Sequence, residues 1–148
     1  MKTILIIFLL GLTFSYDRIG AANYAQKYCN NYNPNYNKYE SKTAENINFI
    51  SQCISIGGGQ DFEGCEGRDD KGMFTKGSDL KNCLISKGWK AAITSKKGSI
   101  AFMIIDNNDV KIITSDKADI IGRVTFCSHT PDRCDAKAST KHFEFFSL

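Results

Sequence analysis

The spacing of apolar residues changes partway along this chain of 148 residues, and that change limits the folds it can adopt. Before Gly88, apolar residues recur every three or four positions in several segments, which is typical of amphipathic helices. After Gly88, short segments rich in Ile, Val and Phe are separated by turn-forming residues, which favours β-strands. Helices first and strands afterwards predict an α+β domain in which N-terminal helices pack on an antiparallel β-sheet.

Capping and turn residues place the individual elements. Asp17 is a suitable N-cap for a helix through Tyr28, and Thr43 for a second helix that ends at Ser55. Ser78 is the expected N-cap of a short third helix. The expected third helix is Asp79–Lys87, and the expected strands are Ser99–Asp106, Val110–Thr114, Ile120–Phe126 and His142–Phe146.

The N-terminus has the features of a secretory signal peptide. Lys2 precedes an apolar run, Ile4–Leu12, and small residues precede a suitable cleavage point after Ser15. The run is too short to span a bilayer as a helix, and a buried N-terminal helix is the alternative interpretation. We therefore expect a signal peptide over 1–15 and one domain over 16–148, with no membrane contact after signal removal. The expected location is outside the cell or in the lumen of an endomembrane compartment.

The charge balance argues against a polyanionic partner. Lys and Arg number 19 and Asp and Glu 16, a net charge of +3 spread along the chain, whereas nucleic-acid binders concentrate basic residues in a patch. A glycine run, Gly57–Gly59, follows the second expected helix instead of preceding a helix. It therefore lacks the free helical N–H groups that bind phosphate. We expect no nucleic-acid partner and no cofactor.

Six cysteines indicate disulfide bonds in an oxidising compartment. Cys127 and Cys134 bracket a short loop, and we expect them to pair with each other. The pairing of the other four stays open among several connectivities. A zinc site is the alternative, but there is no C-x2-C motif and the chain has only two His, so no metal is expected. The expected disulfide cysteines are Cys29, Cys53, Cys65, Cys83, Cys127 and Cys134.

Motifs along nearly the whole mature chain match the sequence pattern of a known family. The first two are Y-N-R-x-x-A-x-x-Y-A and N-P-N-Y, and N-F-V-S-Q-x-L with a later G-G follows. A helix, a G-D-strand passage and a late H-T-x-D-R complete the pattern. The corresponding segments here are Tyr16–Ala25, Asn33–Tyr36, Asn48–Ile54 with Gly57-Gly58, Leu80–Gly88, Gly98–Phe102 and Ser128–Arg133. The chain thus resembles the putative amidase domain, a relative of the NlpC/P60 group in the papain-like cysteine peptidase clan.

This resemblance implies a papain-like fold and an amide hydrolase with a cysteine nucleophile and a histidine base. A cysteine at a helix N-terminus is favoured as thiolate, and the histidine carries its proton. Here Asn46 stands at the nucleophile position and Asp109 at the position of the base. His129 matches the late histidine, which would orient the base. An amide cannot replace a thiolate, so the resemblance implies a member without the family's covalent chemistry.

Other residues offer weaker alternatives for catalysis. Cys53 lies on the same helix face as Asn46, but a disulfide or core role fits it better. His142 lies in the final expected strand, and Asp132 with Glu144 would be a carboxylate pair without supporting spacing. Trp89 could line a groove or close the core.

Three functions remain open from the sequence. The first is a secreted, inactive amidase-domain protein that binds peptide or peptidoglycan fragments in the inherited cleft. The second is an active hydrolase of peptide or peptidoglycan amide bonds. The third is an extracellular interaction protein held together by disulfides, whose groove is filled.

Overall fold

The computed structural model describes residues 15–103, 106, 109–116, 118, 122–129 and 132–148. Residues 1–14 of the expected leader, and residues 104–105, 107–108, 117, 119–121 and 130–131, lie outside the described residues. Within the described part, no helix has the length and apolar character needed to cross a membrane. The elements are α1 Arg18–Tyr28, α2 Lys42–Gln52, the π-helical turn η1 Cys53–Gly57, α3 Gly77–Ser86, β1 Lys90–Ala92, β2 Ile100–Met103, β3 Val110–Ile113, β4 Arg123–His129, β5 Asp132–Ser139, the 3-10 turn η2 Thr140–His142 and β6 Phe143–Ser147.

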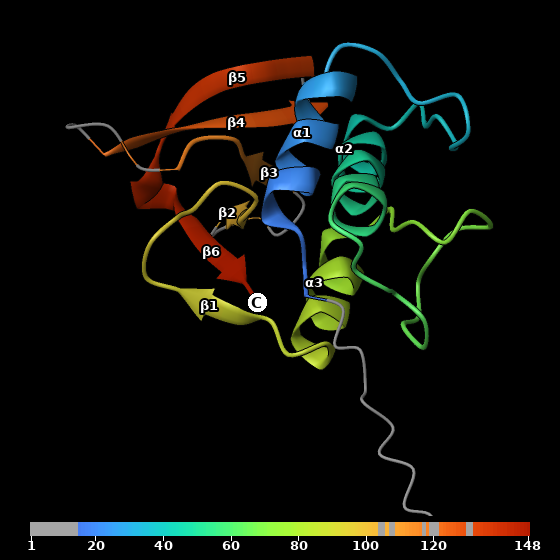
Figure 1. The fold of residues 1–148 in the computed structure, drawn as a ribbon. Coiled ribbons are helices and arrows are strands. Elements are labelled where there is room, and N and C mark those ends of the chain that lie inside the picture. Colours follow the sequence, from blue (N-terminus) through green and yellow to red (C-terminus); the bar gives the residue numbers. More distant parts are fainter. Residues whose placement is uncertain (1–14, 104–105, 107–108, 117, 119–121, 130–131) are drawn as a thin grey trace, which may run out of the picture.

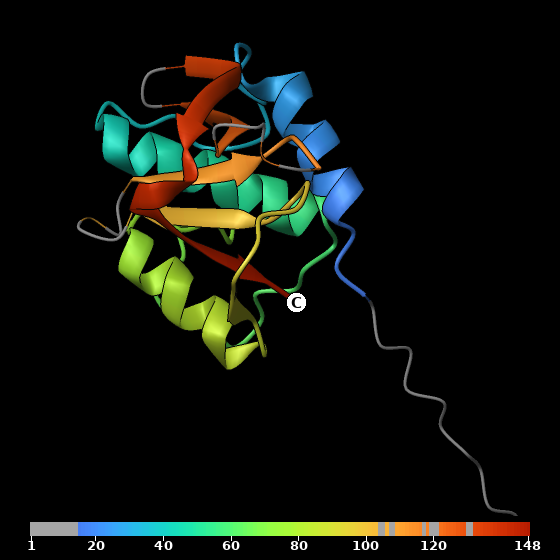
Figure 2. The ribbon, with the colours of Figure 1, turned by 90° about the vertical axis from the view of Figure 1, so that its left-hand side faces the viewer.

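The strands form one antiparallel sheet, and the helices cover one of its faces (Figures 1 and 2). The strand order is β1-β6-β2-β3-β4-β5, so the C-terminal strand β6 lies between the first two strands. The predicted α+β class, with N-terminal helices on an antiparallel sheet and stabilising disulfides, is confirmed.

Local hydrogen bonds explain where the helices begin. Asp17 caps α1 as predicted, since its carboxylate accepts from the Gly20 N–H at 2.9 Å. The cap of α2 is Ser41, whose hydroxyl accepts from the Ala44 N–H at 3.4 Å, so the predicted Thr43 cap is wrong by two residues. Helix α3 begins at Gly77, before the predicted Ser78 cap.

The helices α1 and η1 pack backbone against backbone. A Cβ built on Gly57 would lie 2.6 Å from the Tyr24 Cβ and 2.9 Å from the Gly20 carbonyl oxygen, distances that atoms of a packed core do not reach. The glycine run that follows the second helix therefore allows α1 to approach η1 closely.

The main core lies between the helices and the facing side of the sheet. Helix α2 is its centre, since every residue from Glu45 to Ile54 along α2 and η1 is buried. Trp89 closes this core: it is 2% exposed, its ring packs at a tilt against Tyr16 with centroids 4.6 Å apart, and it donates to the Gln60 side chain at 3.0 Å. A smaller cluster lies on the other face of the sheet, formed by Ala101, Ile113, Val124, Phe126 and Phe145.

The predicted Cys127–Cys134 disulfide is wrong. The segment that was expected to be a loop is the β4–β5 hairpin, with Ser128 opposite Arg133. A bulge at this point places Asp135 at φ 49° and shifts the register of the two strands. Cys127 is buried under α2, whereas Cys134 lies against the end of α1 and bonds Cys29, with Cα atoms 5.4 Å apart.

The expectation of three disulfides is also wrong, because the structure has two. The second joins Cys65 to Cys83, linking the loop before α3 to that helix. Cys53 and Cys127 are free thiols in the main core, and both are fully buried. Burial raises the pKa of Cys53 well above the usual value and that of Cys127 to about 11.

We predict that the folded protein is inert to alkylation even though it contains two thiols. Iodoacetamide at pH 8 should modify no cysteine in the native state, because both thiols are buried and protonated. In denaturant without reductant it should modify two. Mass spectrometry of the intact protein gives both counts. Thr94→Cys, at an exposed position, is the reactive control. A native protein that is alkylated as fast as this control would contradict the structure.

Candidate functional site

Asn46 lies in the first turns of α2, and its carboxamide joins this helix to two strands. Its Nδ2 donates to the Val110 carbonyl of β3 at 2.8 Å. Its Oδ1 accepts from the backbone N–H of His129, at the end of β4, at 2.9 Å. The residue is 1% exposed. The structure therefore brings two of the predicted site residues, Asn46 and His129, together, through a backbone group of His129.

The imidazole of His129 lies beside Asn46 but is held by other groups. Its Nδ1 is 3.3 Å from Glu45 Oε1, and its Nε2 is 2.9 Å from the Tyr28 carbonyl oxygen. The ring is stacked on Phe49 with centroids 3.8 Å apart. The centroid of the Tyr32 ring lies 4.6 Å from that of the imidazole. Glu45 Oε2 accepts from the Tyr39 N–H at 2.7 Å. Both ring nitrogens are thus engaged with the protein.

Asp109 is not part of this group. Its carboxylate pairs with the Lys111 ammonium, which lies over the rings of Phe126 and Phe143 on the sheet face away from α2. Side chains alternate between faces along a strand, so a neighbour of Val110 points away from the helices. The structure therefore does not bring Asp109 together with Asn46.

The remaining candidates are also dispersed. Glu144 pairs with Lys81 of α3 at 2.8 Å, and Asp132 accepts from the Tyr32 hydroxyl at 3.3 Å. Asp132 begins β5 and Glu144 lies in β6, with three strands between them, so the carboxylate pair is not formed. His142 is exposed in η2.

A chain of polar side chains supports the C-terminal half of α2. Tyr24 of α1 accepts from Asn33 and donates to Gln52, both at 2.8 Å. Gln52 in turn donates to Asn48 at 2.7 Å, and Asn48 donates to Asp69 at 3.0 Å. The N-P-N-Y and N-F-x-S-Q motifs therefore belong to one hydrogen-bond network that joins α1, α2 and two loops.

Asp69 is the acceptor at which this network ends. Its carboxylate also accepts from the Tyr39 hydroxyl at 2.8 Å and from the Met73 N–H at 2.8 Å. Burial alone would raise the Asp69 pKa, but these hydrogen bonds favour the charged form and together lower that pKa below its ordinary value. The charged carboxylate thus fixes Tyr39, whose N–H holds Glu45.

A pocket of about 250 Å³ opens above the imidazole. Glu45 and His129 lie at its buried floor, and more exposed side chains form its rim. The sequence indicated His129 here, but Glu45 and Tyr39 were missed because nothing in their spacing marks them. Among the described residues, no three His, Cys, Asp or Glu side chains gather as metal ligands. The pocket is lined by Tyr32, Tyr39, Glu40, Lys42, Glu45, His129 and Asp132.

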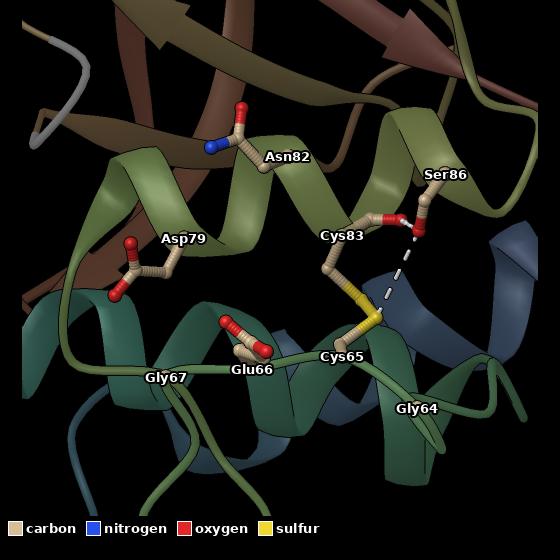
Figure 3. Close-up of a pocket in the computed structure, with 8 residues that line it drawn as sticks. All are labelled: Gly64, Cys65, Glu66, Gly67, Asp79, Asn82, Cys83 and Ser86. Atoms are coloured by element: carbon tan, nitrogen blue, oxygen red, sulfur yellow. Dashed lines mark hydrogen bonds between the residues drawn. A yellow bond between two sulfur atoms is a disulfide. The ribbon is translucent and has the colours of Figure 1, made fainter.

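A second pocket, of about 430 Å³, lies between the loop before α3 and that helix (Figure 3). The Cys65–Cys83 disulfide forms part of its wall, and Glu66 and Asp79 supply carboxylates. None of the residues predicted for the catalytic site lines it.

Comparison with known proteins gives a family match over most of the chain. The sequence model of the putative amidase domain matches residues 15–126, from the residue before Tyr16 to Phe126 of β4, and ends before His129. A segment of 48 residues, 32% of this chain, is 46% identical to the uncharacterized protein YhbB of Bacillus subtilis (strain 168), of which it covers 14%. The match thus spans about a seventh of that relative. No solved structure matches the chain.

We predict that Asn46→Ala lowers the free energy of unfolding by about 2–4 kcal/mol, because it leaves a buried carbonyl and a buried N–H without partners. Urea denaturation monitored by Trp89 fluorescence measures this. Asn35→Ala, at an exposed position, is the matched control and should change the free energy by less than about 0.5 kcal/mol. A loss no larger than that of the control would show that Asn46 does not join the helix to the sheet.

Proposed function

Because this chain belongs to the putative amidase domain family, we propose that it is a secreted member that binds peptide or cell-wall fragments without cleaving them. The observation that carries this proposal is the state of Asn46. It occupies the position at which the resemblance places the nucleophile, and both ends of its carboxamide are bonded to the protein. An amide in this state has neither the nucleophilicity nor the freedom for covalent catalysis.

Neither free thiol replaces the missing nucleophile. The two free thiols are buried in the core, and burial raises the pKa of each, which disfavours the reactive thiolate. His129 is not placed to accept a proton from a substrate beside Asn46. Its two ring nitrogens contact the Tyr28 carbonyl oxygen and the Glu45 carboxylate instead. These contacts support a binding function over hydrolysis.

The pocket above His129 is the proposed binding site. Tyr32 and Tyr39 supply ring surfaces, and Asp132 and Lys42 supply charges at the rim, a combination that suits the apolar and ionic groups of a peptide. The apolar start of the chain and the two disulfides support secretion, because disulfides persist in oxidising compartments.

The test mixes the oxidatively folded protein with purified peptidoglycan and with a peptide pool. We expect mass spectrometry to find no newly cleaved amide bond in either material. We expect the protein to co-sediment with peptidoglycan or to bind a peptide of the pool. Tyr32→Ala should weaken binding about tenfold, the equivalent of about 1.4 kcal/mol. Tyr36→Ala, in the same segment but outside the pocket lining, should bind as the wild type does.

Two outcomes would contradict this proposal. Cleavage that persists after alkylation of thiols would show an active hydrolase with a different catalytic group. If the protein binds neither peptidoglycan nor a peptide of the pool, and neither raises its melting temperature, the result would favour an interaction protein without a ligand cleft.

A further inference from the structure

The two edges of the β-sheet differ in how they are protected. Strand β5 forms one edge, where a bulge at Asp135 interrupts it and the Cys29–Cys134 disulfide ties it to the end of α1. Strand β1 forms the other edge, and among the described residues β6 is the only strand that pairs with it (Figure 1). An unprotected edge presents backbone N–H and C=O groups that can pair with a further strand.

A groove lies beside β1 on the face of the sheet that the helices do not cover. Two adjoining cavities, of about 470 and 520 Å³, form this groove, and both are lined by Ile93, Thr140 and Phe145. Ala92 and Phe143 extend its apolar lining and pack against the smaller core cluster on that face. The side chain of Ile93, directly after β1, is fully exposed. A partner that covers Ile93 would therefore be stabilised by the burial of apolar surface.

Lysines outnumber acidic groups around this groove. They lie on β1, on the loop after it and on η2, and they are Lys90, Lys96, Lys97 and Lys141. Among the described residues, none of these four side chains has a carboxylate within ion-pair distance. The acidic residues that line the groove are Asp116 and Glu144, and Glu144 is already paired with Lys81 at 2.8 Å. The charge of the groove is therefore complementary to an acidic partner.

We propose that the β1 edge and its groove bind an extended, acidic segment of another protein as an additional strand. The backbone of this segment pairs with β1, alternate apolar side chains enter the groove, and acidic residues at its ends face the lysines. A second copy of this chain would bring the same lysines together, and lysines at a sheet edge oppose such pairing. None of the residues that line the pocket above His129 lines this groove, so the proposal does not depend on the proposed function.

The experiment titrates a fluorescent peptide with the full protein and follows its anisotropy. Valine and threonine alternate in the centre of this peptide, and two glutamates form each end. Ile93→Asp should weaken binding about tenfold, because it removes apolar contact and adds a charge of the same sign as the peptide. Ile85→Asp, at a half-exposed isoleucine of α3, is the matched control and should bind as the wild type does. Tyr32→Ala should also bind as the wild type does, because Tyr32 lines the other pocket.

Three altered peptides separate strand addition from attraction of charge alone. Two of them carry N-methyl groups, one on all its valines and the other on all its threonines. Successive N–H groups of a strand point to opposite edges, and an added strand pairs through one edge. One N-methylated peptide should therefore lose binding while the other keeps it. The third peptide has lysines in place of the glutamates and should bind about tenfold more weakly, because its charge has the same sign as that of the groove.

Several results would overturn the proposal. These are no binding of the acidic peptide, equal binding of the two N-methylated peptides, and binding of the lysine peptide as tight as that of the acidic one. Unchanged binding by Ile93→Asp would also overturn it, because the peptide would then lie elsewhere. A dimer in sedimentation that Ile93→Asp abolishes would assign this edge to a second copy of the chain, and so would contradict an acidic partner.

Discussion

The carboxamide of Asn46 connects the three elements that surround the candidate site. A buried amide can donate and accept at once, and here it donates to β3 and accepts from β4 while it is carried by α2. If the Val110 carbonyl or the His129 N–H had no partner in the core, the loss of stability would exceed the net stabilisation from an ordinary hydrogen bond. The position that the resemblance assigns to a nucleophile is therefore used to hold the helix against the sheet.

Around this connection, two sets of polar groups hold α2 in place. Asp69 orders the two loops through Asn48 and Tyr39, because a charged carboxylate gathers several donors at once. Glu45 and His129 tie the helix to β4 and α1. Among the described residues, every buried polar side-chain atom has a partner. The polar side chains of the pocket floor are consequently satisfied within the protein.

Features of the chain that depend on neighbouring residues were predictable from the sequence, and those that depend on distant pairing were not. The Asp17 cap follows from the local sequence. Strand β5 was missed because it is an edge strand with exposed charges and few apolar residues, so its structure comes from pairing with β4. The Cys29–Cys134 bond closes 105 residues of chain, which spacing cannot indicate. The hydrogen bond between Asn46 and His129 uses a backbone N–H, which leaves no signal in the sequence. Asp109 was misplaced because the alternation of side chains along the strand turns it to the other face of the sheet.

Hydrogen exchange at the groups joined by Asn46 tests the central claim most directly. Nuclear magnetic resonance can follow the Asn46 side-chain amide and the His129 backbone N–H in the unmodified protein. If Asn46 joins the helix to the sheet, both groups should exchange only when the whole protein unfolds, at the same opening free energy as the Ile50 amide in the core. Exchange of the Asn46 amide near the rate of an unstructured peptide would show that this side chain is free and open to solvent, and would contradict the account.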